Sequence, residues 1–213
     1  MNGPLKIVPL GAGDIERIME LETTAFDVSI QAERSTILHR FDLGHRMFGA
    51  EDGAGRIVGS IGFSAMTLKG PDFDTLPATF KEYSTQPVPD DAETLCLYSF
   101  GIAPAARGKS CARLLIDAAL EDGRRQGLRD GVADGPLPSL AGSDQVRPRP
   151  GVRSMIERYL ETGQFPEQDA FLQDPVLALY HRLTGCRFVK LLPDFLPEDT
   201  ASAGWRVLLH RQL

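Results

Sequence analysis

Residues 100–115 of the chain, FGIAPAARGKSCARLL, decide how the rest of the sequence is interpreted. A strand pattern ends at a proline, small residues follow, and a helix pattern begins at Ser110. Small side chains at such a turn allow a ligand to approach the backbone, and the free N–H groups of a first helical turn favour a phosphate. We therefore predict an anion-binding loop, to which Arg107, Lys109 and Arg113 add positive charge.

Two other interpretations of this segment compete with that prediction. Gly108-Lys109-Ser110 imitates the end of a nucleoside triphosphate P-loop, but that motif requires a glycine five residues earlier, where the chain has Ala103. The simpler alternative is a tight turn in which Ser110 caps a helix and the basic side chains are solvated surface charges. The surrounding elements decide between these interpretations.

The rest of the chain supplies strands and helices in mixed order. Alternation predicts strands at 5–10, 47–51, 57–66, 94–102, 128–134, 188–192 and 205–210, and helical spacing predicts helices at 14–26, 29–41, 110–126, 152–160 and 175–183. The residues Asp52-Gly53-Ala54-Gly55 between two strands predict a hairpin. This order predicts an α/β (α+β) fold on a mixed sheet.

In this context the segment resembles motif A of the GNAT superfamily, the acyl-CoA-dependent N-acyltransferases. The family pattern is Arg or Gln, two residues, Gly, one residue, then Gly or Ala; here Arg107 begins it, Ala112 ends it, and Ser110 stands where glycine is usual. The resemblance covers most of the chain more faintly and includes a motif-B-like stretch at 179–188. It implies a mixed, mostly antiparallel central sheet with helices on both faces, and acetyl-CoA or another acyl-CoA as co-substrate.

The resemblance also implies which residues hold coenzyme A. The backbone of Phe100 and Ile102 would bind the pantetheine arm as a neighbouring strand would. The pyrophosphate would lie on the loop residues Arg107, Gly108, Lys109, Ser110, Cys111, Ala112 and Arg113. Ser110 is expected to cap the helix and preserve the phosphate contact. We expect the helix N-terminus to lower the pKa of the Cys111 thiol, although the family uses only the backbone at this position.

Direct attack of an amine on a thioester requires a deprotonated amine and a proton for the leaving thiolate. Family members often supply that proton from a tyrosine four residues before the motif-B glycine. Here that glycine is Gly185, the position four residues earlier is His181, and Tyr180 is its neighbour. Chemistry slightly favours Tyr180 and spacing favours His181, so both are candidate acids.

The general base is less clearly marked. Some relatives place a glutamate eight residues before the motif-A proline, where this chain has Cys96, which we interpret as a buried structural thiol. Glu93, at the entry to the same predicted strand, is our candidate base. Glu22, on the first predicted helix, is a second candidate.

Bulk properties limit the other function classes. The 213 residues suffice for one domain over 1–213, in which 135–173 is an insertion before the motif-B helix that lines a pocket or forms a homodimer contact. A net charge of −6 gives no reason to expect nucleic acid or a membrane as partner. Three dispersed cysteines, four histidines without metal-ligand spacing and no recognisable signal peptide predict a cytoplasmic protein without a metal.

The sequence therefore predicts an enzyme that transfers an acyl group, acetyl by default, from coenzyme A to an amine. The acceptor would be a small molecule, an amino acid or a peptide. Two alternatives stay open: a longer-chain fatty acyltransferase whose insertion lines a tunnel, and a non-catalytic acyl-CoA-binding or sensor module.

Overall fold

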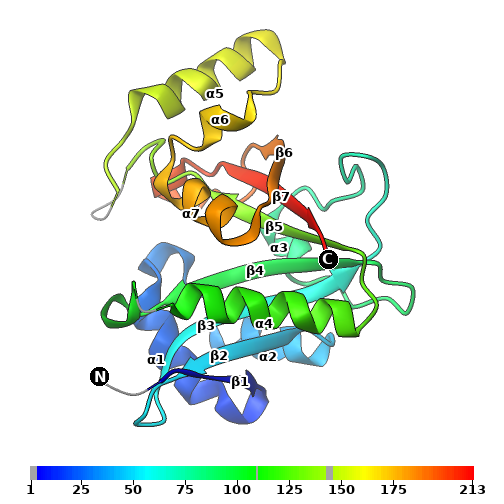
Figure 1. The fold of residues 1–213 in the computed structure, drawn as a ribbon, viewed down its shortest axis with the longest axis vertical. Helices are drawn as coiled ribbons and strands as arrows, with labels where there is room; N and C mark the ends of the chain where they lie inside the picture. The colour runs from blue at the N-terminus through cyan, green and yellow to red at the C-terminus, as the bar shows by residue number, and fades with distance from the viewer. Residues whose placement is uncertain (1–3, 109, 143–145) are drawn as a thin grey trace. The chain divides into compact units, whose positions relative to one another are not determined.

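A computed structural model describes residues 4–108, 110–142 and 146–213. The chain divides into two compact units, which we describe separately (Figure 1). Unit 1 comprises residues 1–68, 84–131 and 212–213, and unit 2 comprises residues 69–83 and 132–211. The predicted insertion at about 135–173 lies entirely in unit 2. That the chain forms one domain with an insertion stays a prediction.

Unit 1 is built on four antiparallel strands in the order β1-β2-β3-β4. They are β1 (Lys6–Leu10), β2 (Arg46–Glu51), β3 (Ile57–Met66) and β4 (Thr94–Ile102). The predicted hairpin between β2 and β3 is confirmed, because Asp52 Oδ1 accepts the Ala54 amide at 2.9 Å and Gly55 takes a φ of +76°. The strands predicted for this unit are therefore confirmed to within a residue at their ends.

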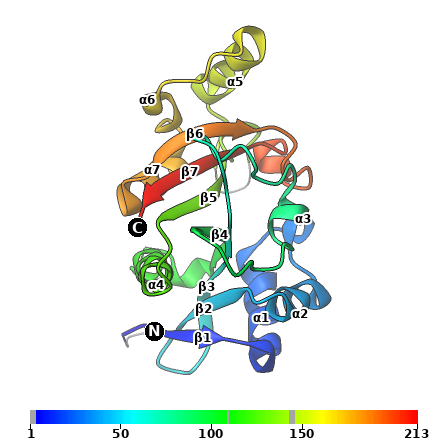
Figure 2. The same cartoon turned by 90° about the vertical axis from the view of Figure 1, so that its right-hand side faces the viewer.

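Helices cover both faces of the unit 1 strands (Figure 2). On one face lie α1 (Ile15–Ala25) and α2 (Arg34–Asp42), and on the other lies α4 (Cys111–Arg125). The first face is closed by an apolar cluster that includes Leu10, Ile18, Leu21, Ile37 and Met47. The α4 face buries Leu115, Ile116, Ala119 and Leu120, the stripe that helical spacing predicted.

The connection between α1 and α2 differs from the prediction of a helix at 29–41. Asp27 accepts the Ser29 amide and caps a short 3-10 helix, η2 (Val28–Ile30), and Gln31 then turns to an extended ψ of 133°. The second helix therefore begins only at Arg34. A second 3-10 helix, η1 (Ala12–Asp14), precedes α1, and there Asp14 accepts the Gly11 amide instead of capping α1.

Unit 2 contains β6 (Arg187–Leu192) and β7 (Arg206–Gln212), which pair antiparallel, and most of β5 (Asp130–Pro136), in the order β5-β7-β6. β5 begins two residues later than the prediction of 128–134, because Gly127 (φ +78°) and the Leu128-to-Gly123 bond still belong to the end of α4. The short helix α3 (Phe80–Tyr83) forms in the stretch of chain between β3 and β4, where no element was predicted. Its Phe80 and Tyr83 rings pack on Phe195.

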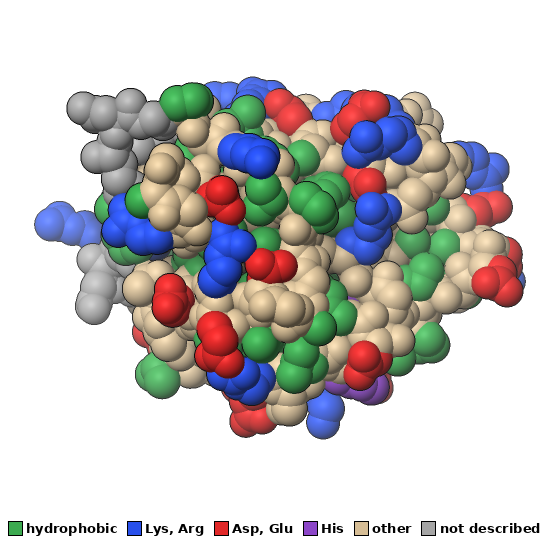
Figure 3. Space-filling view, turned by 90° about the horizontal axis from the view of Figure 1, so that it is seen from below, with side chains coloured by type: hydrophobic (Ala, Val, Ile, Leu, Met, Phe, Trp, Pro, Cys, Tyr) green, Lys and Arg blue, Asp and Glu red, His purple; other side chains and the backbone are tan. Residues whose placement is uncertain are grey.

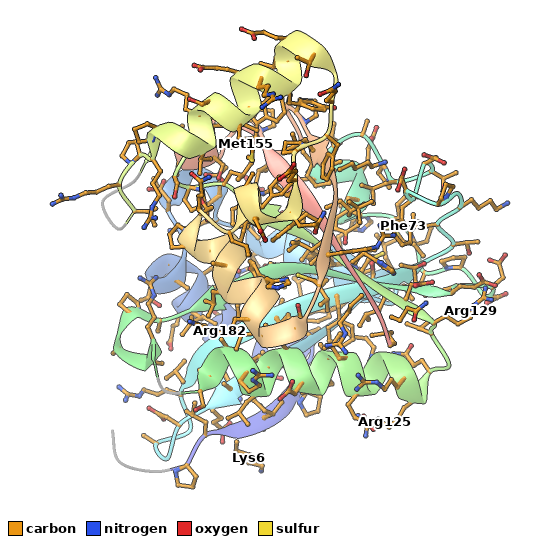
Figure 4. The ribbon with its side chains drawn as sticks, turned by 45° about the horizontal axis from the view of Figure 1, so that its top comes forward. Lys6, Phe73, Arg125, Arg129, Met155 and Arg182 are labelled. Carbon is orange, nitrogen blue, oxygen red and sulfur yellow. The ribbon has the colours of Figure 1, made fainter. Side chains whose placement is uncertain are left out.

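The remaining helices of unit 2 are α5 (Pro150–Thr162), α6 (Gln168–Phe171) and α7 (Pro175–Thr184), with a 3-10 helix η4 (Thr200–Ser202). The predicted helix at 152–160 is thus confirmed and longer, whereas α6 was not predicted. Met155 lies on the side of α5 that faces the rest of unit 2 (Figure 4). It joins an apolar cluster with Leu137, Phe171, Leu177, Phe188 and Val207. The inserted segment therefore contributes to the core of unit 2.

Charged side chains of both signs are mixed on the face of the molecule seen in Figure 3. The described helices are all too short or too polar to cross a bilayer.

Candidate active site

The predicted anion loop follows β4 in unit 1. A 3-10 helix, η3 (Pro104–Ala106), leads to Gly108, whose φ is +74°, and to Ser110, whose φ is +61°. Glycine adopts this left-handed conformation freely, but serine is strained there by roughly 1 kcal/mol. Lys109, which the sequence also assigned to this loop, lies outside the described residues.

Ser110 does not cap α4 with its side chain, which corrects the sequence prediction. A capping hydroxyl requires an extended backbone at that position, and the left-handed backbone of Ser110 turns the side chain away from the N–H groups it would bind. The residue occupies a left-handed conformation that glycine adopts freely. The phosphate contact therefore depends on the backbone alone at this position.

The start of α4 presents unused backbone donors. The first bond inside the helix runs from the Leu114 amide to the Ser110 carbonyl at 3.0 Å. Within the described part of the loop, the amides of Cys111 and Ala112 have no acceptor. Because a helix of 15 residues concentrates partial positive charge at this end, the two amides favour the anion that the sequence predicts here.

Two arginines flank these amides. The Nε atom of Arg107 donates to the Ile102 carbonyl at 3.3 Å, and Arg113 lies 4.0 Å from Asp117, the outer limit of an ion pair. Both side chains are exposed. Their guanidinium groups are suited to a phosphate, which is the ligand that the sequence predicts for them.

Cys111 is buried and holds α4 close to the sheet. A Cβ atom added at Gly59 of β3 would lie 2.7 Å from the Cys111 Sγ, so glycine is required opposite this thiol. Burial raises the pKa of Cys111 to about 11. The expectation that the helix N-terminus lowers this pKa is wrong, because desolvation of the thiolate outweighs the helix dipole here.

A β-bulge separates the two halves of β4. Phe100 pairs with Ile61 and Tyr98 with Gly62, so Ser99 is the extra residue, and its φ is +49°. Phe100 and Ile102, the predicted pantetheine partners, lie between this bulge and the loop. No feature of the sequence indicated the bulge, because serine carries no turn signal inside an alternating strand.

Glu93, the predicted base, lies at the other end of β4. It is exposed and forms an ion pair with Arg129. At roughly 3.3 Å per residue, the nine residues of β4 separate Glu93 from the loop by about 30 Å. Arg129 lies at the same end of α4 as Arg125, away from the loop that begins the helix (Figure 4). The role of Glu93 as the base stays a prediction, which the position of Glu93 does not favour.

Tyr180 and His181 lie in the last turns of α7 in unit 2. The sequence builds this helix as predicted, because Asp174 accepts the amides of Val176 and Leu177 and Gly185 (φ +67°) ends it. Tyr180 packs against the core of the unit. Burial, reinforced by Asp134, raises the pKa of its phenol well above the ordinary value, so it remains a neutral proton donor.

His181 is exposed, and its ring is oriented by the backbone. Its Nδ1 lies 2.7 Å from the Cys186 carbonyl oxygen, which can only accept, so Nδ1 carries the proton. The neutral imidazole therefore presents Nε2 as an acceptor, and the imidazolium presents it as a donor. Both candidate acids keep a form suited to proton transfer, and which one acts stays a prediction.

The structure also shows a buried polar network that the sequence did not indicate. On the α1–α2 face of unit 1, His45 Nδ1 lies 2.6 Å from the Tyr98 hydroxyl and His45 Nε2 lies 2.6 Å from the Gln86 carbonyl. Arg40 donates from Nε to the Ser84 carbonyl and from Nη2 to the Ser84 hydroxyl. These residues are dispersed in the chain and share no spacing that a sequence pattern would reveal.

Comparison with known proteins identifies the family. Residues 15–133, more than half of the chain, match the acetyltransferase (GNAT) family. The loading GNATL domain of CurA from Lyngbya majuscula is 20% identical, with a TM-score of 0.73 and 98% of each chain covered. A GphF GNAT-like decarboxylase in complex with isobutyryl-CoA is 21% identical, with a TM-score of 0.73 over 97% of this chain and 98% of that one.

A GNAT superfamily phosphinothricin acetyltransferase from Sinorhizobium meliloti, in complex with AcCoA, is 15% identical, with a TM-score of 0.55 over 98% of this chain and 88% of that one. No protein of curated function matches the chain. These likenesses confirm the predicted fold class, a mixed α/β fold with helices flanking its strands. The chain therefore belongs to the acetyltransferase (GNAT) family.

Proposed function

We propose that the chain binds an acyl-CoA, acetyl-CoA by default, and transfers its acyl group to an amine of a small molecule, amino acid or peptide. The observation that supports this most is the start of α4, where the amides of Cys111 and Ala112 have no acceptor within the described part of the loop and two exposed arginines are close in sequence. A pyrophosphate fits such a site because it carries several charged oxygens. The pantetheine arm would then extend along Phe100 and Ile102.

In this reaction the amine nitrogen attacks the thioester carbonyl carbon, and the carbon–sulfur bond breaks. The amine loses a proton to a base, and the thiolate gains one from Tyr180 or from the imidazolium of His181. Tyr180 keeps its proton at neutral pH because its pKa is raised by burial. His181 would have to be protonated beforehand, so its use as the acid would show as a loss of rate on the alkaline side.

Coenzyme A binding is tested first. In titration calorimetry, Arg107→Glu combined with Arg113→Glu should weaken binding by a few kcal/mol, because charge-assisted contacts contribute roughly 1.5–3 kcal/mol each. Arg124→Glu, at the other end of α4, is the matched control and should bind as the wild type does. Equal affinity of all three proteins would contradict the proposal.

A second candidate function is decarboxylation of a 2-carboxyacyl-CoA thioester, such as malonyl-CoA. The observation that favours it is the likeness over nearly the whole chain, insertion included, to a GNAT-like decarboxylase at a TM-score of 0.73, against 0.55 for the acetyltransferase. In this reaction carbon dioxide leaves, the thioester enolate takes a proton at carbon, and the thioester survives. An acid such as Tyr180 or His181 is needed, but a base for an amine is not.

The fate of the thioester separates the two functions. Acyl transfer from acetyl-CoA to an amine releases a free thiol, which a thiol reagent detects. Decarboxylation of malonyl-CoA releases carbon dioxide and leaves acetyl-CoA without any free thiol. Thiol release that requires an amine supports transfer, and carbon dioxide without an amine supports decarboxylation. Coenzyme A binding with neither product would support a sensor, and a series of acyl lengths tests the longer-chain alternative.

A further inference from the structure

Glu22, in the last turn of α1, is a buried carboxylate. Its residue is 2% exposed, and its Oε2 accepts the Ala32 amide at 3.0 Å, so a neutral donor is its hydrogen-bonding partner. Burial raises its pKa, and the Ala32 amide and the charge of Arg40 on α2 oppose this rise only in part. A carboxylate in such surroundings accepts a proton more readily than a solvated one.

The end of α1 lies over the half of β4 that leads to the anion loop. A Cβ atom added at Gly101 would lie 2.6 Å from the Phe26 ring and 3.2 Å from the Ala25 Cβ. Glu22 precedes Phe26 by four residues, which places both on the same side of the helix. The carboxylate therefore belongs to the layer that covers the predicted pantetheine-binding residues.

Ser60 adds a second polar group beneath the same helix end. It pairs with Gly101 across the β3–β4 ladder, so both residues point to the α1 face. Its hydroxyl is buried and has no hydrogen-bond partner within the described part of the chain. Because buried hydroxyls normally have a partner, this one is available to a bound molecule.

We propose that Glu22 is the general base for the amine acceptor, which binds at the end of α1 with the Ser60 hydroxyl as its second polar contact. This inference rests on the proposed acyl transfer. The ligand class is a primary amine that arrives as the ammonium ion, which the negative carboxylate attracts. Glu22 takes one proton from the ammonium nitrogen and passes it to solvent, the freed electron pair attacks the thioester carbon, and the carbon–sulfur bond breaks. The nitrogen loses its second proton as the amide forms, which balances the proton that the leaving thiolate gains.

Glu22 suits this role better than Glu93. Glu93 is exposed, paired with Arg129 and at the far end of β4 from the loop. Glu22 is buried and lies over the half of β4 that leads to the loop. Among the described residues, it forms no ion pair.

The test compares Glu22→Gln with Glu20→Gln, at an exposed glutamate of the same helix, as its matched control. Glutamine retains an oxygen that can accept the Ala32 amide but cannot take a proton. With acetyl-CoA and a primary amine, kcat/KM of Glu22→Gln should fall by roughly 10²–10⁴-fold, the usual contribution of a positioned base. Coenzyme A affinity should be unchanged, and Glu20→Gln should stay within about twofold of the wild type on the same scale.

Two further readouts separate catalysis from a structural role. In the wild type, the apparent pKa of the acidic limb of the kcat/KM profile should be higher than the ordinary glutamate pKa of about 4.3. This limb should be absent in Glu22→Gln. The melting temperature of Glu22→Gln at neutral pH should rise, because a buried charge is removed. Ser60→Ala should raise KM for the amine by about tenfold and also raise the melting temperature, since an unpaired buried hydroxyl is removed.

Near wild-type turnover and an unchanged acidic limb in Glu22→Gln would overturn this assignment while leaving acyl transfer intact. A wild-type protein that binds coenzyme A and acylates no amine would overturn both proposals. If Glu22→Gln fails to fold, Glu22→Asp replaces it, since the shorter carboxylate keeps the charge but loses reach. Full activity of Glu22→Asp with an unshifted acidic limb would equally overturn the assignment.

Discussion

The two faces of the unit 1 sheet differ in the kind of polar group that they present. On the α4 face, Gly59 and the buried Cys111 thiol allow the helix to lie close to β3. The groups proposed to bind an anion there are backbone amides. On the α1–α2 face, the groups of interest are buried side chains: Glu22, Arg40 and His45. The first face can tolerate a change of side chain if the backbone keeps its course, whereas the second depends on particular side chains in a desolvated layer.

The largest expected effect is on the α1–α2 face, at Arg40. Arg40→Met keeps most of the volume but removes the bonds to the Ser84 carbonyl and hydroxyl and the stacking of the guanidinium 5.1 Å from the Tyr98 ring centre. Since hydrogen bonds to charged groups contribute roughly 1.5–3 kcal/mol each, the free energy of unfolding should fall by about 3 kcal/mol. Urea unfolding measures this loss.

Arg158→Met, on the exposed side of α5, is the control for Arg40 and should leave stability unchanged. Equal stability of both variants would mean that the buried network contributes nothing to the α1–α2 face.

A smaller effect is expected on the α4 face, from Gly59→Ala. The new methyl group would lie 2.7 Å from Cys111 Sγ, so the first turn of α4 must shift, at a cost of about 1–3 kcal/mol. Coenzyme A affinity should fall with stability, because the free amides belong to that turn. Calorimetry and thermal unfolding measure both.

Cys111→Ala removes the sulfur and should restore the Gly59→Ala protein in a double-mutant cycle. The same substitution should not rescue Gly101→Ala, whose clash is with Phe26 on the opposite face. Rescue of both variants, or of neither, would contradict the separation of the two faces.

A gain in stability is expected from Ser110→Gly. Glycine relieves the strain of a φ of +61°, so the free energy of unfolding should rise by about 1 kcal/mol while coenzyme A affinity is retained. Ser110→Ala keeps the strain and loses only the hydroxyl, so it should match the wild type. A loss of stability in Ser110→Ala would show that the hydroxyl does cap α4.

The smallest effect concerns the pH dependence of the α1–α2 face. Burial lowers the pKa of His45 in the folded state. As pH falls below about 6.5, the ordinary pKa of histidine, the imidazole is therefore protonated in the unfolded state before it is protonated in the folded state. Stability should therefore decline from that pH downward until the lowered pKa is passed. Unfolding free energies measured across this range should decline less for His45→Gln than for the wild type.

Sequence patterns predicted the elements that local chemistry specifies. Alternation located the four strands of unit 1, and Asp174, Pro175 and Gly185 located α7 within a residue. The start of α4 was predictable too, because a proline, small residues and an amphipathic stripe each act over a few positions. These signals depend on neighbours in the chain, which the sequence contains.

Other features depend on distant neighbours. The short helix α3 forms where Phe80 and Tyr83 meet Phe195, and α6 is joined to β6 by the side chain of Gln168, which bonds the Phe188 amide and carbonyl. Neither contact has a local signature. The same holds for the left-handed backbone of Ser110 and the bulge at Ser99, where serine takes a conformation for which it has no preference.

The sequence by itself determined the fold class, the family and the position of the loop proposed to bind an anion, because periodicity, turn residues and motif spacing are local properties. Only the tertiary structure decided which titratable groups carry altered proton affinity. Glu22 and Glu93 are equivalent as letters, yet Glu22 is a buried residue of α1 and Glu93 is exposed beside Arg129. The reason is desolvation, since the cost of charging a carboxylate depends on the atoms that surround it in space and not on its neighbours in the chain.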